Sequence, residues 1–531
     1  MNFSHLHSSP ARLCCGVWLA TVCGLFATLA LFTSAATAQI LPPEVDAALQ
    51  RAKVPRDAVT MLVVDVQGKA AARLSHRANV PVNPASVMKL VTTYAALDLL
   101  GPAFSWSTQV VVEGAVRDGT LFGNLYIKGQ GDPKLVSERL WLLLRRVQGL
   151  GVKTIAGDIV LDRSAFETVE VDPASFDGEP LRPYNAAPDA LLLNFKSVVM
   201  TFVPDRTANI AQVQFEPPLA GVQMQSSVPL SGGDCNGYRA ALKADFSDPA
   251  QIRFGGTYPA SCGEKVWGVA YADAKSYATR AVEGMWREMG GKLAGSVREG
   301  RVPSPQGIAL KPAFEVASPP LPEVIRDINK YSNNVMAQQL FLTLSLQAKA
   351  AAPGATGSVS SVSSSSANSA NSVTSTAAGS PATPRSAAVG SGEAATLAAS
   401  RDIVQRWWRS TISAEDVPTI DNGSGLSRTD RITAQALARL LQSAYASPYM
   451  PELMSSLPIS GVDGTLRRSR STARGSPHLK SGTLANVAGA AGYVLAASGR
   501  RYVMVMIVNH PNAIAARPAI EALLDWTVKD N

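Results

Sequence analysis

The two ends of the chain carry the same kinds of element, and this limits how the chain can fold. At the amino end, a helical pattern over 43–52 precedes strand-like runs at 59–66 and 70–76. At the carboxyl end, strand-like runs at 488–496 and 502–508 precede a further helical pattern. Because a lone strand pair is not stable, we expect both ends to build one α+β domain, with the middle of the chain inserted into it.

The length and composition fit a protein of several domains. The chain has 531 residues, of which 46% are hydrophobic, so it can build packed cores and is not a disordered chain. The formal net charge of +8 is a mild excess for this length. It is far from the strong basic bias of nucleic-acid-binding proteins, and we expect no nucleic-acid partner.

The first residues form a targeting segment. Arg12 precedes an apolar, uncharged run over 13–32, and Ala36-Thr37-Ala38 is a small-x-small cleavage site. This order predicts a secretory signal peptide over 1–38 and an exported protein. The apolar run is also long enough for a retained membrane anchor, which stays the alternative.

The cysteines agree with export. Cys14, Cys15 and Cys23 belong to the predicted signal peptide, which leaves Cys235 and Cys262 in the mature chain. An even pair in an oxidising compartment favours a disulfide. Two buried free thiols are the alternative.

The middle of the chain has a different pattern from its ends. Between about 103 and 305, short strand-like runs alternate with Gly, Pro and Asp, and helical patterns occur at 134–149 and 276–290. The part over 194–264 consists almost wholly of short strands and turns. A Ser/Ala/Gly-rich tract over 350–392 cannot build a core, so we expect a flexible insertion there.

One predicted helix brings two chemically useful side chains together. The segment from Asn83 to Gly101 is typical of a helix with Asn83 as N-cap and Pro84 in the first turn. Ser86 and Lys89 then lie on one face. A lysine whose pKa is lowered by burial and by a second cation can take the proton of the serine, which makes the serine a nucleophile. Taken alone, the pair is explained as well by two exposed polar residues on a core helix.

Two later motifs favour the catalytic interpretation. Ser332-Asn333-Asn334 stands at the head of an apolar helix, and Lys480-Ser481-Gly482-Thr483 enters a strand. Ser-x-x-Lys, Ser-x-Asn and Lys-Ser/Thr-Gly, in this order, form the set used by penicillin-recognising acyl-serine enzymes.

Each polar residue of the set has a physical task in such an enzyme. Ser332 can relay a proton between Lys89 and a leaving amine, and Asn334 can hold Lys89 in place. Lys480 adds positive charge, which helps to keep Lys89 neutral and attracts a carboxylate. The expected catalytic residues are therefore Ser86, Lys89, Ser332, Asn334 and Lys480.

The strand motif supplies the expected binding groups. The backbone N–H groups of Ser86 and Thr483 would form an oxyanion hole. The hydroxyl groups of Ser481 and Thr483 can bind a terminal carboxylate. Gly482 is expected to leave room for a substrate backbone against the strand.

The remaining polar clusters predict no competing site. His76, His478 and His510 lack metal-ligand spacing, so we expect no metal and no cofactor. The arginine-rich run over 467–474 is expected to be a solvated loop rather than a binding patch.

The chain resembles the class C low-molecular-mass penicillin-binding proteins, the D-alanyl-D-alanine carboxypeptidase/endopeptidases of the penicillin-binding protein four type. Besides the three motifs, matching pieces are "GQGDPKL" (129–135), "DNGSGLSR" (421–428) and "LPISGVDGTL" (457–466). The long insertion between the first two motifs is also typical of this family. The third motif reads Lys-Ser-Gly where the family commonly has Lys-Thr-Gly, a change that keeps the hydroxyl group.

The resemblance implies a fold. A β-lactamase/transpeptidase-like domain, with an antiparallel sheet flanked by helices, would comprise residues 39–102 and 310–531. An α/β domain over 103–193 and 265–309 would be inserted in it. A small β domain over 194–264, which holds both mature cysteines, would be nested inside the insertion.

The resemblance also implies a serine-type D-Ala-D-Ala carboxypeptidase with DD-endopeptidase activity. Ser86 would be acylated by the penultimate D-Ala of a peptidoglycan stem peptide, D-Ala or a cross-linked amine would leave, and water would hydrolyse the acyl-enzyme. The partners would be peptidoglycan stem peptides and β-lactam antibiotics. The protein would be located in the periplasm, either soluble or loosely membrane-associated. Asp177 and Arg428 would line the part of the site that holds a diaminopimelate side chain. A non-catalytic cell-wall-binding scaffold and a β-lactamase of the same fold are the alternatives.

Overall fold

The computed structural model describes residues 41–168, 171–308, 310–351 and 394–530. The predicted signal peptide over 1–38, and all of the 350–392 tract after its first two residues, lie outside these ranges. Within the described ranges, no helix combines the length and the apolar character needed to cross a bilayer.

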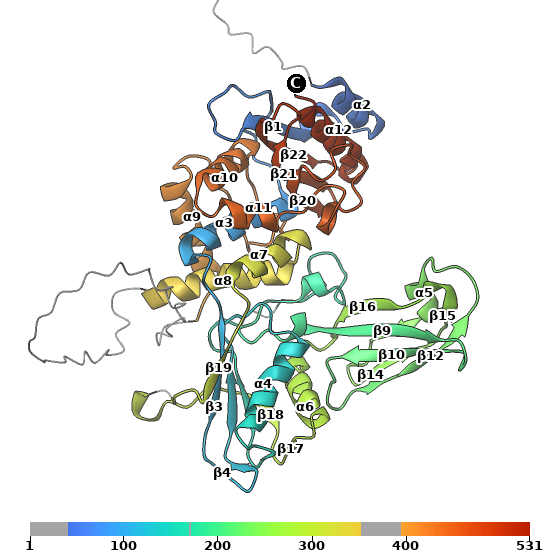
Figure 1. Cartoon of the computed structure of the whole chain (residues 1–531), viewed down its shortest axis with the longest axis vertical. Helices are drawn as coiled ribbons and strands as arrows, with labels where there is room; N and C mark the ends of the chain where they lie inside the picture. Colours follow the sequence, from blue (N-terminus) through green and yellow to red (C-terminus); the bar gives the residue numbers. More distant parts are fainter. Residues whose placement is uncertain (1–40, 169–170, 309, 352–393, 531) are drawn as a thin grey trace, which may run out of the picture. The chain divides into compact units, whose positions relative to one another are not determined.

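Strands from the two chain ends form one five-stranded antiparallel sheet (Figure 1). Its order is β2 (Leu74–His76), β1 (Val59–Asp65), β22 (Arg501–Asn509), β21 (Val487–Leu495) and β20 (His478–Leu484). The direct pairing of β1 with β22 joins the amino and carboxyl ends, as the sequence pattern predicts. The third motif lies on β20, an edge strand, whose outer side already bonds to Pro458 and Ile459 at its first two residues, His478 and Leu479.

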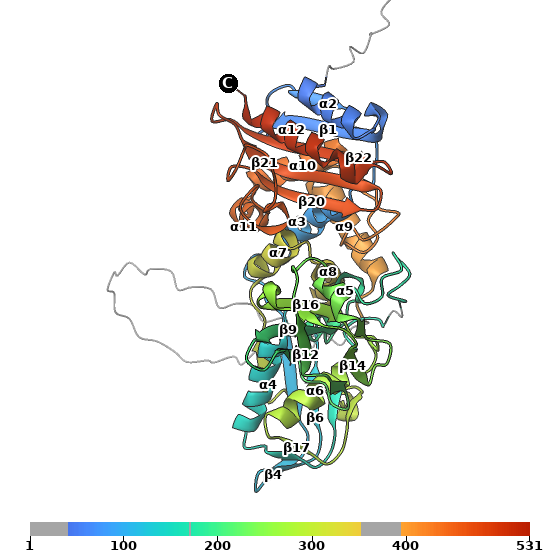
Figure 2. The ribbon, with the colours of Figure 1, turned by 90° about the vertical axis from the view of Figure 1, so that its right-hand side faces the viewer.

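The sheet is covered on both faces, which explains the composition of its central strands. α2 (Pro43–Arg51) and α12 (Arg517–Val528) share a core with one face, and Figure 2 shows α12 in front of the sheet. α3 (Lys89–Leu100) and α10 (Ala434–Ala446) share a core with the other face. A strand covered on both faces needs apolar residues at successive positions, and β22 accordingly reads RYVMVMIVN with only its two end residues partly exposed.

The helix that follows Ser86 is enclosed on all sides over most of its length. Every residue from Lys89 to Leu97 is buried, whereas Leu99, near its end, is exposed. α3 packs against α7 (Leu321–Lys330) and α8 (Asn334–Ala351) and shares their core with the sheet. A helix that is enclosed in this way needs no polar stripe.

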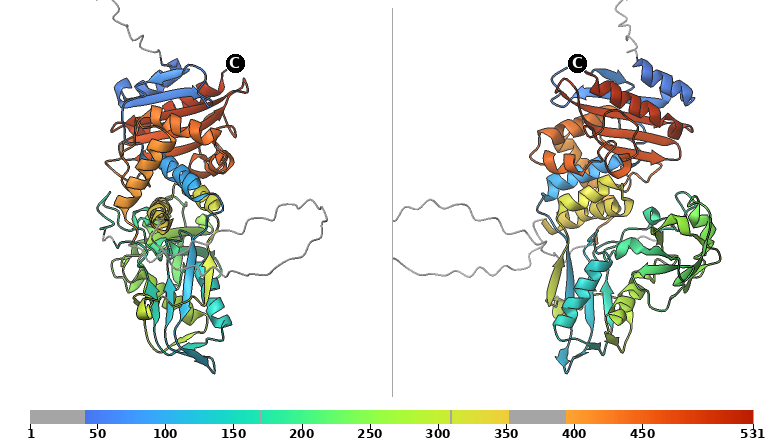
Figure 3. Two further views of the ribbon diagram at one scale, coloured as in Figure 1. Left: turned by 90° about the vertical axis from the view of Figure 1, so that its left-hand side faces the viewer. Right: turned by 45° about the vertical axis from the view of Figure 1, so that its right-hand side comes forward.

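The middle of the chain forms separate sheets, shown in Figure 3. One has the order β18 (Val297–Glu299), β8 (Ile159–Asp162), β6 (Leu125–Lys128), β3 (Ser107–Val112) and β19 (Phe314–Ala317). Another has the order β17 (Lys292–Leu293), β7 (Thr154–Ile155), β5 (Thr120–Phe122) and β4 (Ala115–Arg117). The helices α4 (Ser137–Gly149) and α6 (Tyr277–Glu288) share a core with these strands. Residues 120–128 thus supply two short strands, β5 and β6, to different sheets.

The section with the two mature cysteines is built mainly of short strands, as the sequence predicts. Its largest sheet has the order β15 (Tyr258–Pro259), β12 (Ser227–Ser231), β10 (Ile210–Glu216), β9 (Ser197–Asp205) and β16 (Lys265–Ala270). A three-stranded sheet follows the order β11 (Gln223–Met224), β14 (Gln251–Phe254) and β13 (Ala244–Asp245). Cys235 and Cys262 form the expected disulfide, with their Cα atoms 4.8 Å apart. The division of the whole chain into three domains with the boundaries given above stays a prediction.

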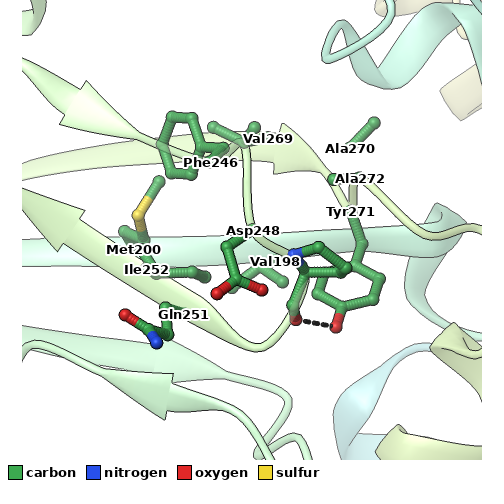
Figure 4. Close-up of a pocket in the computed structure, with 11 residues that line it drawn as sticks. Val198, Met200, Phe246, Asp248, Gln251, Ile252, Val269, Ala270, Tyr271 and Ala272 are labelled. Carbon is green, nitrogen blue, oxygen red and sulfur yellow. Dashed lines mark hydrogen bonds between the residues drawn. The ribbon is translucent and has the colours of Figure 1, made fainter.

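A small hollow in this section lies between Met200, Phe246 and Tyr271 (Figure 4). The hydroxyl group of Tyr271 donates a hydrogen bond to the carbonyl oxygen of Pro249 at its edge. Its volume of about 10 Å³ has room for one water molecule rather than a substrate. None of the three motifs lines this hollow.

Candidate active site

Ser86 lies in a short 3₁₀ turn rather than in the predicted α-helix. The turn η2 (Ala85–Met88) precedes α3, which begins at Lys89. The Oδ1 atom of Asn83 accepts a hydrogen bond of 2.9 Å from the backbone N–H of Ala85. This is a local turn bond, so the prediction of Asn83 as a helix N-cap is wrong. Ala85 has a φ of 49°, a conformation that is strained for a residue with a side chain and that directly precedes Ser86.

Two glycines let other backbone segments close on this turn. A Cβ atom at Gly425, which has a φ of 76°, would lie 2.0 Å from the carbonyl oxygen of Ala85. A Cβ atom at Gly482 would lie 2.5 Å from the carbonyl oxygen of Pro84. The space at Gly482 is therefore filled by the turn that carries Ser86. Gly482 also lines a cavity that opens at Ser86, and its expected role in making room for a substrate backbone stays a prediction.

Lys89 is fully buried and its amine lies within hydrogen-bond distance of three oxygen atoms. Its Nζ atom lies 2.9 Å from Ser86 Oγ, 2.6 Å from Asn334 Oδ1 and 2.5 Å from the carbonyl oxygen of Ser424. Burial, followed by the positive charge of Lys480, holds the pKa of Lys89 well below its usual value. A neutral amine has two N–H donors, which Asn334 and Ser424 can accept, and one lone pair. The lone pair is then free to accept the hydroxyl proton of Ser86.

The second and third motifs are joined by Lys480. This lysine is fully buried, and its Nζ atom donates to Ser332 Oγ over 3.0 Å and to the carbonyl oxygen of Ser481 over 2.8 Å. Burial lowers the pKa of Lys480 to about 7. The expected proton relay through Ser332 starts from Lys89, but in the described part of the chain Ser332 hydrogen-bonds Lys480 instead.

Two cavities open at Ser86, and they share Ser86, Ser332 and Thr483. Cavity A has a volume of about 810 Å³ and is also lined by Asn334, Phe176, Asp177 and Arg428. Cavity B has a volume of about 450 Å³ and is also lined by Ser481, Gly482, Arg468, Arg517 and Glu521. Both volumes fall within the range of small-molecule binding sites.

Asp177 and Arg428 lie in the same cavity without pairing with each other. The carboxylate of Asp177 accepts hydrogen bonds from the Tyr184 hydroxyl group (2.9 Å) and from Asn185 Nδ2 (2.8 Å). Arg428 donates to the carbonyl oxygen of Phe176 over 3.3 Å, and its guanidinium group lies 4.6 Å from the centre of the Phe176 ring. Both charged groups are therefore positioned by neighbours and still face the cavity.

Asp430 is a buried acid near the site that the sequence gives no reason to single out. Its side chain is fully buried, and its Oδ1 atom accepts a hydrogen bond of 2.8 Å from the backbone N–H of Asp421. Its Oδ2 atom has no hydrogen-bond partner within the described ranges. Burial raises the pKa of Asp430 to about 7, and its negative charge, when present, raises the pKa of Lys89. A single Asp in a polar loop carries no sequence signal of such burial.

The chain matches a family of known enzymes over nearly all of its described part. The family model of D-Ala-D-Ala carboxypeptidase 3 (S13) matches residues 41–377 and 384–529. The D-alanyl-D-alanine carboxypeptidase DacB of Haemophilus influenzae is 24% identical over 437 residues, which are 80% of this chain and 80% of that protein. The D-alanyl-D-alanine carboxypeptidase of Actinomadura sp. strain R39 is 27% identical over 463 residues, which are 83% of this chain and 76% of that protein.

Solved structures support the fold. Penicillin binding protein 4 from Haemophilus influenzae has a TM-score of 0.64 at 20% identity, covering 90% of this chain and 99% of its own. A complex of the same protein with a novel β-lactam has a TM-score of 0.61 at 20% identity, covering 91% and 99%. This similarity confirms the predicted α+β, transpeptidase-like fold. The match of the family model confirms the resemblance found in the sequence, and the chain belongs to the D-Ala-D-Ala carboxypeptidase 3 (S13) family.

Proposed function

We propose that the protein is a serine-type D-Ala-D-Ala carboxypeptidase and DD-endopeptidase that acts on peptidoglycan stem peptides and their cross-links. The observation that carries this proposal is the contact of Ser86 Oγ with the buried amine of Lys89, at 2.9 Å. A serine hydroxyl group is a poor nucleophile by itself, and a buried lysine with a lowered pKa is the kind of base that activates it.

The first half of the reaction forms an acyl-enzyme. Lys89 takes the proton of Ser86, and Oγ attacks the carbonyl carbon of the penultimate D-Ala. The N–H groups of Ser86 and Thr483 donate to the oxyanion that forms. The C–N bond then breaks. The leaving amine takes a proton from the hydroxyl group of Ser332. Lys480 then donates a proton to Ser332 along their hydrogen bond of 3.0 Å.

The second half releases the product. Water attacks the ester carbonyl, and the bond to Ser86 Oγ breaks as this oxygen takes back the proton that Lys89 holds. Lys480 takes up the proton that the water loses and is again positively charged. A pKa of about 7 lets Lys480 give and accept a proton near neutral pH.

Cavity A suits the acyl side of the substrate. A diaminopimelate side chain ends in both an ammonium and a carboxylate group. Asp177 and Arg428 offer one charge of each sign in this cavity, and each makes its hydrogen bonds with other neighbours. This arrangement supports Asp177 as the partner of the ammonium group and Arg428 as the partner of the carboxylate.

β-Lactams would acylate Ser86 in the same way as the peptide, with slow deacylation.

The test is substitution of the nucleophile. We expect the purified Ser86→Ala protein to lose labelling by fluorescent penicillin, release of D-Ala, and cleavage of cross-linked muropeptides, as followed by mass spectrometry. Ser455→Ala, at an exposed serine of α11 (Met450–Ser456), is the matched control and retains all three. Labelling that survives in Ser86→Ala would place the nucleophile elsewhere.

The two alternative functions give different results in the same assay. A non-catalytic scaffold would bind muropeptides but show no Ser86-dependent labelling or product. A β-lactamase would turn penicillin over rapidly and leave D-Ala-D-Ala peptides intact. Amino-terminal sequencing of protein from the cell envelope tests export, and we expect it to begin at Gln39.

A further inference from the structure

Cavity B, which shares Ser86, Ser332 and Thr483 with cavity A, carries charged residues that the proposed reaction does not use. It begins at Ser86, Ser481 and Thr483 and extends toward the start of α12. Its outer part is lined by Arg468, Arg517 and Glu521.

Arg517 contacts a residue of the third motif. Its Nη2 atom donates a hydrogen bond of 3.1 Å to the hydroxyl oxygen of Thr483. Within the described ranges, its exposed side chain makes no other hydrogen bond and no ion pair. A guanidinium group has five N–H donors, so most of its donors remain available to a ligand. Arg517 is also the first residue of α12, where the helix dipole disfavours a positive charge, so helix stability does not explain its presence.

Arg468 belongs to the arginine-rich run that the sequence predicts to be a solvated loop. Glu521 holds this loop, because its Oε1 atom accepts hydrogen bonds from the backbone N–H of Arg470 (2.8 Å) and from Ser469 Oγ (3.3 Å). The side chain of Arg468 makes no hydrogen bond or ion pair with the part of the chain that the structure describes, and it lines cavity B. The cavity thus has two guanidinium groups with free donors, whereas one oxygen of its carboxylate already accepts two hydrogen bonds.

We propose that cavity B receives the leaving group of the substrate, with Arg517 binding the carboxylate next to the scissile bond and Arg468 binding a further carboxylate of a cross-linked leaving group. This inference rests on the proposed function. The hydroxyl group of Thr483 is the expected partner of the terminal carboxylate, and Arg517 donates a hydrogen bond to that hydroxyl group. A planar guanidinium group binds a carboxylate with two parallel hydrogen bonds, which a hydroxyl group cannot do.

The two arginines then have different tasks. Released D-Ala has a single carboxylate, beside the amine that leaves. A cross-linked leaving group has a carboxylate at the same place and continues into a second stem peptide with further carboxylates. Arg517 acts on both substrates, and Arg468 distinguishes the cross-linked substrate from the simple one.

The test of Arg517 is a binding measurement that needs no turnover. Calorimetry with the Ser86→Ala protein compares a peptide that ends in D-Ala-D-Ala with the same peptide ending in the amide of D-Ala. We expect the free acid to bind about 10- to 100-fold more tightly, as for other charge-assisted hydrogen bonds. Adding Arg517→Gln should reduce the preference to less than about threefold, and Arg517→Lys should restore part of it. Arg467→Gln, at the exposed neighbour of Arg468 that does not line the cavity, should keep the full preference.

The test of Arg468 uses turnover with Ser86 intact. We expect Arg468→Gln to lower kcat/KM for a cross-linked muropeptide dimer about three- to tenfold more than for a pentapeptide monomer, because only the dimer reaches this residue. Two results would overturn the inference: equal affinity for the acid and the amide, or a preference for the acid that Arg517→Gln leaves unchanged. The proposed function would still hold in either case if release of D-Ala depends on Ser86. The proposed function itself would fail if labelling by penicillin did not depend on Ser86. The comparison of acid and amide binding would then still decide the role of Arg517.

Discussion

Lys480 Nζ lies 3.0 Å from Ser332 Oγ, although the two residues are 148 positions apart in the sequence. This hydrogen bond holds the second and third motifs together beside Ser86. It also places a second buried amine near Lys89, and the charge of Lys480 lowers the pKa of Lys89. Two buried cations repel each other, so the pair favours a neutral Lys89, the form that can activate Ser86.

Removing Lys480 should therefore change the pH dependence of acylation. In Lys480→Gln the pKa of Lys89 rises, and Lys89 is protonated up to a higher pH. We expect the acidic limb of the pH profile of penicillin acylation to move to higher pH. The acylation rate at pH 6, relative to the rate at pH 9, should fall by about tenfold or more, since one pKa unit changes the neutral fraction of Lys89 tenfold. Lys53→Gln, at an exposed lysine, is the control. An unmoved limb would show that Lys480 does not act through Lys89.

Asp430 should make the protein less stable as the pH rises. Its pKa is about 7 in the folded chain and its ordinary value is 3.8, so the folded state keeps a proton that the unfolded state releases. The free energy of unfolding then falls as the pH rises from about 4 to about 7, by up to about 2–4 kcal/mol at about 1.4 kcal/mol per pKa unit.

Chemical denaturation at pH 4, 5.5, 7 and 8 tests this effect. We expect Asp430→Asn to lose stability less steeply than the parent protein between pH 4 and 7, because the amide does not titrate. Asp57→Asn, at an exposed acid of the short turn over 56–58, should follow the parent curve. Parallel curves for Asp430→Asn and the parent would contradict the raised pKa.

The parts of the site that the sequence predicts are those encoded in short segments. Ser86, Lys89 and Asn334 meet because a Ser-x-x-Lys pair shares one turn and Ser-x-Asn begins a helix beside it. The pairing of β1 with β22 follows from apolar runs at both chain ends, each long enough to be a buried strand. Such features depend on local pattern, which a single sequence shows.

The parts that the sequence does not predict depend on what packs against each residue. Whether Ser86 begins an α-helix or a 3₁₀ turn depends on the neighbouring backbone that Gly425 and Gly482 bring close. The burial of Asp430 and the contact of Arg517 with Thr483 depend on elements far away in the sequence. Tertiary packing overrides local propensity at these positions.

Gly482→Ala should disturb the nucleophile rather than block the substrate. The added Cβ atom would meet the carbonyl oxygen of Pro84 at 2.5 Å and the backbone nitrogen of Val87 at 3.1 Å, so the turn that carries Ser86 must move. We expect acylation by penicillin to fall at least about 100-fold, because small misplacements of a reacting group have effects of this size. Stability should fall by about 1–3 kcal/mol, as for other overpacked sites.

The control for this substitution is Gly149→Ala at the end of α4, where a Cβ atom would meet nothing within 4 Å. We expect it to leave both acylation and thermal stability close to those of the parent protein. An acylation rate in Gly482→Ala equal to that of the control would mean that the turn tolerates the added methyl group.

Asp177 and Arg428 should affect peptide substrates more than penicillin. Both line cavity A, and neither is engaged by the other, so their charges are available to the two ends of a diaminopimelate side chain. We expect Asp177→Asn and Arg428→Gln each to lower kcat/KM for a diaminopimelate-containing pentapeptide by about 10-fold or more. For a lysine-containing pentapeptide, whose side chain ends in an ammonium group alone, Arg428→Gln should have a smaller effect than Asp177→Asn. The same loss on both peptides in both variants would mean that these residues hold the loop at Phe176 in place and do not recognise the side chain, since a structural role does not depend on which charge the substrate carries.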